Sequence, residues 1–484
     1  MADKTIKFFK GISTQTVVTL AMGVMEIVVF AIISRLLSKE DFGYFAAISG
    51  IIAIFLSISE AGLGSSIIQK KDASYTFVST AFTWSLIIGS IVAIIVFIFA
   101  PTLANIIADS KLTIPLRVMS ITILLNSIIS VGNGILYRKL SFKTVGIISI
   151  ASYFFASSVS ITMATMGLGL YAVIALPIVN AIVHSCALFY IVKFPKLQIQ
   201  RTETKEIVSF GGWLTLGVIF NNLTQQLDKL LLPKWMSIET LGSYNRPAGF
   251  VSSISMRING IFDTVLFPML SDFQNDRTKV NHVLQMSVSL LNSFSVILAA
   301  LFFFNAHLII TVFFGENWLD LVPIMQIVSI SIIFNINGRL VDCFFRSLAY
   351  VKLGFYLRVL AASITFGCIY IGSSNGVHGV ATSIVIANIV NILIKLGCLT
   401  KKTNTSIIDI ASRMFNAWRP IIPILFIGIP YIIYSNGCII DDISFAVLFT
   451  LVVGIEFIVF PKFIGEVYYV RVFPIIKGLI NKIL

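Results

Sequence analysis

Long apolar runs recur along the whole chain, separated only by short stretches that carry charge, glycine, proline or asparagine. Each run has about 20 residues, the length of α-helix that crosses the roughly 30 Å hydrocarbon core of a bilayer. Only 12% of the 484 residues are charged, whereas water-soluble domains carry about 25%. Because so few charges cannot coat a globule of this size, its surface must face hydrocarbon. The sequence therefore predicts an all-α, polytopic membrane protein with about fourteen transmembrane helices.

The loops between the apolar runs alternate in charge. Most of the 35 lysines and arginines fall on one side of the membrane, including those of the basic stretches 138–143, 193–205 and 395–419. Positively charged loops stay in the cytoplasm, so we expect both termini inside and an even number of spans. The net charge of +13 therefore reflects membrane topology and does not indicate a nucleic-acid partner.

Motifs for catalysis or cofactor binding are missing from the sequence. The five cysteines form no CxxC pair, and the four histidines show no metal-ligand spacing. There is no P-loop, no dinucleotide fingerprint and no HExxH motif. We therefore expect no cofactor, no metal site and no enzymatic activity.

An internal repeat divides the chain. The segment RLLSKEDFGYF (35–45) aligns without gaps on KWMSIETLGSY (234–244), and YRKLSFKTVG (137–146) matches FRSLAYVKLG (345–354). Six spans in each repeat give both copies the same orientation, with a symmetry axis along the membrane normal. We expect two six-helix lobes, followed by two further spans and an interfacial tail, with boundaries at 1–205, 206–400 and 401–484.

Polar residues inside the predicted spans lie mainly in the second half of the chain. A charged side chain at mid-bilayer costs about 2.5–3.5 kcal/mol, so such residues usually face a water-filled interior or pair with each other. Two helical stripes stand out, and four further polar residues accompany them. The first stripe is Asn221, Gln225 and Asp228; the second is Asn335, Arg339, Asp342 and Arg346; the others are Arg246, Arg257, Asp263 and, in the first half, Glu60.

Each of these residues also has a structural alternative. Arg339 and Asp342 could form an ion pair that locks two helices. Arg246 lies near a span end, where a long side chain reaches the interface by snorkelling. Asp228 could pair with the lysine that follows it, and the small residues after Glu60 suit close helix packing.

Several stretches together suggest a family. These are SRLLSKEDFGYF (34–45), LSISEAGLGSSIIQKKD (56–72), SFGGWLTLGVIFNNLTQQLDKLLLPKW (209–235), LGSYNRPAGFVSSIS (241–255) and VLFPMLSDFQND (265–276). They resemble the polysaccharide transporters (O-antigen and exopolysaccharide flippases) of the multidrug/oligosaccharidyl-lipid/polysaccharide exporter superfamily, over essentially the whole chain. Asp228, Gly242, Tyr244 and Pro268 match family-typical positions, whereas LLPKWMS (231–237) stands where the family has a Gly-rich turn.

The resemblance implies a V of two lobes around a hydrated, cationic cavity in the bacterial cytoplasmic membrane. The implied cargo is an undecaprenyl-diphosphate-linked oligosaccharide, moved by a monomer among membrane lipids and coupled to a proton or sodium gradient. Arginines suit a diphosphate because their planar fork pairs with phosphate oxygens. We therefore expect the residues to divide by role. The diphosphate would be contacted by Arg257 and Arg339, assisted by Arg246. The sugars would be contacted by Asn221, Gln225 and Asn335. The arginines would be oriented, or a coupling cation bound, by Asp228, Asp342, Glu60 and Asp263.

Two other functions remain open on the sequence alone. A drug or cation exporter of the same superfamily would favour a compact acidic pocket over several cavity arginines. A membrane-embedded polymerase or ligase would need sizeable loops with catalytic residues, and the predicted outer loops are short.

Overall fold

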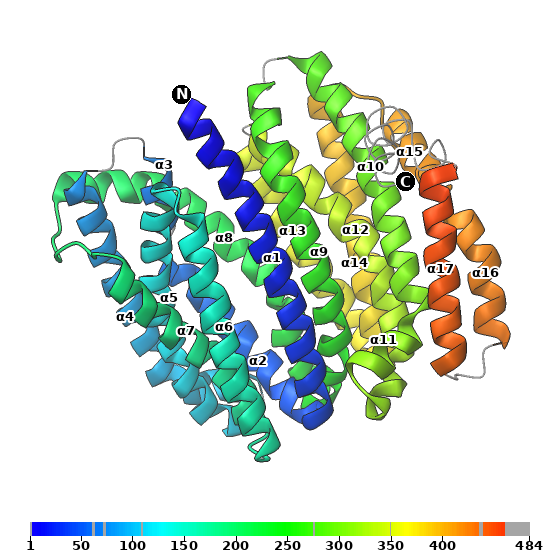
Figure 1. Cartoon of the computed structure of the whole chain (residues 1–484), viewed down its shortest axis with the longest axis horizontal. Helices are drawn as coiled ribbons and strands as arrows, with labels where there is room; N and C mark the ends of the chain where they lie inside the picture. Colours follow the sequence, from blue (N-terminus) through cyan, green and yellow to red (C-terminus); the bar gives the residue numbers. More distant parts are fainter. Residues whose placement is uncertain are drawn as a thin grey trace. The chain divides into compact units, whose positions relative to one another are not determined.

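The computed structural model describes residues 2–459 apart from 61–62, 71–73, 108–109, 274–275, 349 and 435–438. In this part of the chain every regular element is a helix and no strand occurs, which confirms the all-α prediction (Figure 1). The chain divides into two compact units, Met1–Asn245 and Arg246–Leu484. The boundaries at residues 205 and 400 remain a prediction.

The first unit is built from eight α-helices and the start of a ninth. They are α1 (Ala2–Leu36), α2 (Lys39–Glu60), α3 (Leu63–Gln69), α4 (Tyr75–Ile107), α5 (Thr113–Arg138), α6 (Phe142–Thr165), α7 (Leu170–Ile191), α8 (Arg201–Trp235) and the first residues of α9 (Ile238–Asp272). Within this unit α4 packs on α5, α6 on both α7 and α1, and α2 on α8.

The second unit contains the rest of α9 and eight further α-helices. They are α10 (Arg277–Phe304), α11 (Ala306–Phe313), α12 (Val322–Ser347), α13 (Val351–Gly372), α14 (Gly376–Thr403), α15 (Ile407–Asn416), α16 (Ile421–Tyr434) and α17 (Ile439–Val459). Here α12 packs against α10 and α14, and α13 packs on α14.

The number of membrane spans is only partly established. Nine segments of the described chain are long and apolar enough to cross a bilayer, and a tenth results if α15 and α16, bent by 50° at their junction, form one span. The structure is therefore that of a multi-pass membrane protein, but the predicted count of fourteen is not confirmed.

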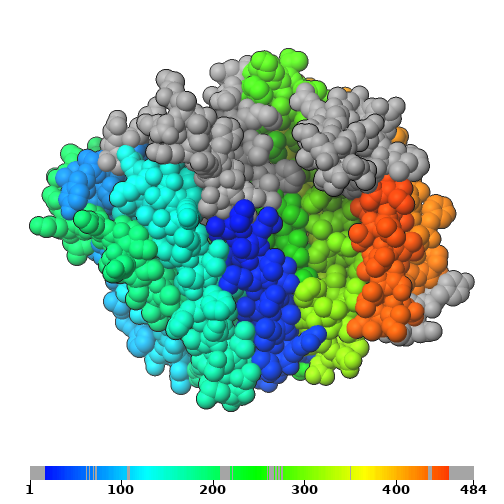
Figure 2. All heavy atoms as spheres, in the orientation of Figure 1, coloured from blue at the N-terminus to red at the C-terminus, as the bar shows by residue number. Residues whose placement is uncertain are grey.

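The outward-facing side chains of α1 indicate which solvent surrounds this helix. Along α1, Val17, Leu20, Val24 and Val28 form a stripe in which every side chain is more than half exposed. Figure 2 shows α1, in blue, at the surface of the molecule. A continuous apolar stripe exposed on a helix costs free energy in water but none in lipid, so this face is suited to acyl chains.

The repeat predicted from the sequence appears as a close crossing of α2 and α9. A Cβ atom added to Gly43 would lie 2.0 Å from the carbonyl oxygen of Ile238, and one added to Gly242 would lie 1.9 Å from that of Lys39. Gly43 and Gly242 are equivalent in the repeat, and so are Lys39 and Ile238. The two contacts are therefore reciprocal, as a local two-fold rotation axis requires.

The last two helices are anchored to the second unit by apolar and polar contacts. Ile424 of α16 and Phe445 and Phe449 of α17 pack with Phe304 of α10. Asp442, almost fully buried, lies 2.5 Å from Nδ1 of His307 on α11 and also accepts a hydrogen bond from the Tyr431 hydroxyl. The carboxylate thus ties α11, α16 and α17 together.

Candidate functional site

The polar stripe of α12 is present in the second unit much as its spacing predicts. Asn335, Arg339 and Asp342 are all half-buried and follow one another along the helix, whereas Arg346 at its end is exposed. Among the residues that the structure describes, Asn335 makes one long contact, 3.5 Å from its Nδ2 to the Ser331 hydroxyl on its own helix. Its amide is therefore left for a ligand or for water.

Asp342 pairs with a lysine of α14 and not with Arg339. The distance from Lys395 Nζ to Asp342 Oδ2 is 3.0 Å, and the two side chains are 14% and 19% exposed. A charge removed from water in this way is tolerated when its partner offsets the desolvation. This ion pair joins α12 to α14 and neutralises the only acidic residue of the stripe.

Arg339 has no ion-pair partner in the described part of the chain. Among the described residues it makes no hydrogen bond and no ion pair, although it is half-buried within an apolar helix. The next acidic side chain along the stripe is already neutralised by Lys395. An arginine in this position favours an anionic ligand, because its five N–H donors need acceptors.

A second polar group lies in the first unit, where α8 approaches the start of α9. Asp228 is half-buried and its Oδ1 accepts the backbone N–H of Lys229 at 2.9 Å. The hydroxyl of Tyr244, which is only 3% exposed, donates a second hydrogen bond to this carboxylate. The carboxylate is thus held by neutral donors and by the charge of the adjacent Lys229.

Gln226 is a further polar residue of α8, at the contact of this helix with α2. Its Oε1 is buried and has no hydrogen-bond partner among the described residues. The same oxygen lies 3.9 Å from the position of a Cβ on Gly50 of α2, where α2 and α8 pack together. A buried oxygen without a donor is rare in proteins.

The remaining predicted residues are distributed over both units. Gln225 is exposed, and Glu60, at the end of α2, is half-buried with no ion pair in the described part of the chain. Arg246 and Arg257 of α9 are both half-buried, and each is engaged in interactions. The side chains of Asn221 and Asp263 lie outside the described residues, so their predicted roles are untested.

Sequence reasoning missed Lys395 and gave Tyr244 no role. Lys395 was assigned to a basic loop, but it lies within α14, eight residues before that helix ends. Asn388, Asn391 and Lys395 follow at i, i+3 and i+7, which is the signal of a shared helix face. No pattern along one helix could show that Lys395 meets Asp342.

Among the described residues no group of His, Cys, Asp or Glu is arranged to hold a metal.

Known proteins match this chain over most of its length. The family model described as "Polysaccharide biosynthesis protein" matches residues 32–323. The "Lipopolysaccharide biosynthesis protein WzxC" of Escherichia coli (strain K12) is 22% identical over 442 residues, covering 90% of this chain and 87% of that protein. The "Succinoglycan biosynthesis transport protein ExoT" of Rhizobium meliloti (strain 1021) is 24% identical over 363 residues, covering 73% and 72%.

Solved structures share the fold. The lipid II flippase MurJ, in an inward closed conformation, superimposes with a TM-score of 0.69 over 91% of this chain and 98% of that one, at 15% identity. An inward-facing multidrug resistance MATE family transporter of the MOP superfamily gives a TM-score of 0.65 at 16% identity, covering 81% and 94%.

An all-helical fold with apolar helices long enough to cross a bilayer defines a multi-pass membrane protein, and its fold is shared with a lipid II flippase and a MATE family transporter. Within that class the chain belongs to the polysaccharide biosynthesis protein family, whose model covers more than half of it. The resemblance to polysaccharide transporters inferred from the sequence is therefore confirmed.

Proposed function

We propose that the protein is a flippase that moves an undecaprenyl-diphosphate-linked oligosaccharide across the bacterial cytoplasmic membrane for surface polysaccharide assembly. Relatives named for lipopolysaccharide and succinoglycan biosynthesis, and the shared fold of a lipid II flippase, support this cargo class. Burial of each CH₂ of the lipid carrier is worth about 0.8 kcal/mol, so the tail stays in the bilayer. Only the charged diphosphate-sugar head has to cross.

Arg339 is the observation on which the proposal depends most. A half-buried guanidinium within a membrane helix, with no counter-charge among the described residues, is costly in the empty protein. A diphosphate would offset that cost, because the planar fork of arginine pairs with two phosphate oxygens at once. Arg257 and Arg246 would supply further cationic contacts, and Asn335 and Gln225 would contact the sugars.

The acidic residues would have different roles in this scheme. Asp342 is already balanced by Lys395, so its role would be to fix the helix face that carries Arg339. Asp228 is held by two neutral donors and by the charge of Lys229, and we assign it as the carboxylate that takes up and releases a proton or a sodium ion. Glu60 and Asp263 remain further candidates for coupling.

Replacement of Arg339 tests the proposal in cells that lack their own copy of the transporter. Arg339→Ala should lower surface polysaccharide at least about tenfold, because a charge-assisted hydrogen bond contributes roughly 1.5–3 kcal/mol. Lipid-linked precursor should accumulate on the inner leaflet. Arg339→Lys should export at an intermediate level, since a point charge lacks the bidentate fork.

The matched control is Arg346→Ala, which removes an exposed arginine from the same helix and should leave export intact. Membrane levels of each variant are measured by immunoblot, so that loss of insertion is not read as loss of transport. Full export by Arg339→Ala would contradict the assignment of this arginine to the diphosphate.

A cation-coupled drug exporter of the same superfamily is the alternative. That function requires acidic side chains free to meet a cationic drug in the cavity. The acid of the α12 stripe is bound to Lys395, and Arg339 lies one helical turn away. The charge of this helix face therefore favours an anionic cargo.

A further inference from the structure

The connection between α7 and α8 crosses the surface of the first unit in extended form over residues 193–200 and leads into the first turns of α8; we call residues 193–206 the strap. Residues 193–200 have no helical structure, and Gln200 has extended backbone angles (φ −113°, ψ 132°). The strap joins the two sequence repeats. A basic connection of this kind is usually a solvated, flexible linker whose backbone groups bond to water.

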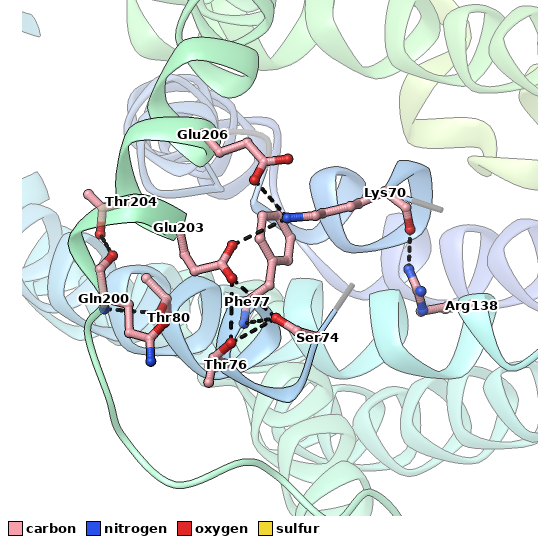
Figure 3. A network of polar contacts seen from close by, with 10 residues as sticks. All are labelled: Lys70, Ser74, Thr76, Phe77, Thr80, Arg138, Gln200, Glu203, Thr204 and Glu206. Carbon is pink, nitrogen blue, oxygen red and sulfur yellow. Dashed lines mark hydrogen bonds and ion pairs between the residues drawn. The ribbon is translucent and has the colours of Figure 1, made fainter. Parts of the chain in front are cut away.

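The backbone of the strap is instead bonded to side chains of α4. Every second residue turns its amide toward that helix, as the period of an extended chain allows. The amides of Lys196, Gln198 and Gln200 donate to the hydroxyls of Tyr75, Thr83 and Thr80, at 2.9, 3.0 and 3.2 Å. Figure 3 shows the last of these bonds.

The carbonyl groups of the strap are bonded in the same way. Ser79 donates its hydroxyl hydrogen to the carbonyl of Lys196, and Thr83 shares its single hydroxyl hydrogen between the carbonyl groups of Ser79 (2.8 Å) and Gln198 (3.2 Å). Tyr75, Ser79 and Thr83 are spaced i, i+4 and i+8, so they form one stripe along α4. Ser79 is fully buried and Thr83 is 8% exposed, so these hydroxyls face the strap and not water.

Aromatic packing fixes the start of the strap. The ring of Phe194 stacks on Phe82 of α4 with 4.7 Å between centroids, and lies 4.9 Å from the ring of Phe189 on α7. Phe194 belongs to the same apolar cluster as Val131 and Leu188, which are buried in the core of the unit. The strap is thus part of the hydrophobic core at this end.

An ionic latch fixes the other end of the strap, at the first turns of α8. Lys70, just beyond α3, places its ammonium 3.2 Å from Glu203 and 2.7 Å from Glu206. In Figure 3 the same ammonium lies over the ring of Phe77, 4.1 Å from the centroid. The second oxygen of Glu203 accepts hydrogen bonds from the hydroxyls of Ser74 and Thr76, at 3.2 and 3.4 Å.

The chain that carries Lys70 is itself held. Arg138, in the last turn of α5, donates to the carbonyl group of Ile67. It also donates to the carbonyl group of Lys70, as Figure 3 shows. Partial burial lowers the pKa of Lys70, but the hydrogen bonds and charges of Glu206 and Glu203 outweigh it and raise the pKa overall. A lysine whose pKa is raised in the folded protein stabilises it below about pH 10.5 and loses that effect as the pH rises through the folded pKa. Near neutral pH Lys70 therefore stays protonated, so its ion pairs with Glu203 and Glu206 are weakened by salt but not by small changes of pH.

We infer that the strap is a fixed structural element of the first unit and not a flexible hinge between the repeats, with Lys70 as its latch. The connection becomes free to bend only beyond Glu206, inside α8. When the start of α8 moves, α3 and α4 then move with it, because the strap does not bend between them. This inference concerns the architecture of the connection and holds whatever the transported molecule is.

Hydrogen–deuterium exchange of the purified protein in lipid nanodiscs tests the inference. Peptides covering residues 196–206 should exchange as slowly as peptides from the interior of α4. Thr83→Val keeps the shape of the side chain and removes both hydrogen bonds to Gln198, so exchange in this peptide should rise about tenfold. Thr162→Val is the matched control, because the exposed Thr162 hydroxyl bonds only to the Ser158 carbonyl of its own helix, at 2.8 Å.

Charge reversal tests the latch separately. Lys70→Glu should raise exchange over residues 200–206 about threefold, and the double variant Lys70→Glu with Glu206→Lys should restore most of the protection. Lys139→Glu, at an exposed lysine, should change nothing in this segment. Exchange of the wild-type strap as fast as in an exposed loop, or strap exchange unchanged by Thr83→Val, would overturn the inference. Failure of the double variant to restore protection would remove Lys70 as the latch.

Discussion

At the scale of single residues, Asp342 and Lys395 show how two opposite charges are accommodated between membrane helices. Each side chain is less than one-fifth exposed, and the two lie 3.0 Å apart on neighbouring helices. Removing one member leaves the other charge buried and unpaired, which costs more than the pair itself contributes. The pair therefore acts as a unit, whereas Arg339 on the same helix face has no ion-pair partner in the part of the chain that the structure describes.

Single substitutions in this pair should be worse than the double substitution. Lys395→Met should lower the stability of the protein by roughly 3 kcal/mol, because Asp342 is left without its partner. Lys395→Met combined with Asp342→Leu should recover much of this loss. Thermal unfolding of the detergent-purified variants measures both effects, and equal stability of the single and double variants would show that the charges do not interact.

The residue scale also marks a limit of sequence reasoning. The spacing of Asn335, Arg339 and Asp342 correctly indicated one polar helix face, because side-chain direction along a helix follows from its period. The same spacing left open whether Asp342 pairs with Arg339. The structure pairs it with Lys395, more than fifty positions further along the chain, and only the packing of α12 on α14 determines that contact.

At the scale of helices, the crossing of α2 and α9 has the tightest steric requirement. Gly43 and Gly242 bring backbone against backbone at equivalent positions of the two repeats. Any larger side chain at either position has to push a carbonyl group away, and backbone does not yield as a flexible side chain does.

Gly43→Ala and Gly242→Ala should each destabilise the protein by about 1–3 kcal/mol. The double variant should cost less than the sum of the two, because both changes open the same crossing. Gly397→Ala is the control: a Cβ there meets nothing within 4 Å, so the higher helix propensity of alanine should leave stability unchanged or slightly increased. Thermal unfolding in detergent gives the ranking, and an unaffected Gly43→Ala would mean that the helices do not cross this closely.

The sequence predicted the presence of helices much better than it predicted where they end and how the segments between them run. The apolar runs lie in the helices that the structure contains, because a backbone in lipid must satisfy its hydrogen bonds internally. The sequence shows residues 193–205 only as a basic stretch between apolar runs. In the structure residues 193–200 are extended along α4, since the hydroxyls of that helix, remote in sequence, supply the partners that helix formation would otherwise provide.

At the scale of the whole molecule, the membrane orientation is the main expectation still to be measured. Loop charge predicts both termini in the cytoplasm, with residues near 139 inside and residues near 374 outside. Both Lys139 and Ser374 are exposed, so both positions accept a reporter.

Cysteine labelling measures this orientation. In a background without the five native cysteines, Ser374→Cys should react with a membrane-impermeant maleimide in intact cells. Lys139→Cys should react only after the membrane is permeabilised. The reverse pattern would invert the orientation, and labelling of both in intact cells would contradict the span assignment between them.

The sequence by itself determined that this chain is an all-helical membrane protein, that it contains a repeat, and which helix faces carry polar groups. These properties follow from local composition and period, which act within a single helix or between a helix and lipid. Only the tertiary structure decided that Asp342 meets Lys395, that Tyr244 holds Asp228, that Asp442 ties three helices together and that the strap is fastened to α4. Each of these contacts joins residues of different elements, and it is selected because a polar partner offsets the cost of removing a polar group from water, which no single segment can do alone.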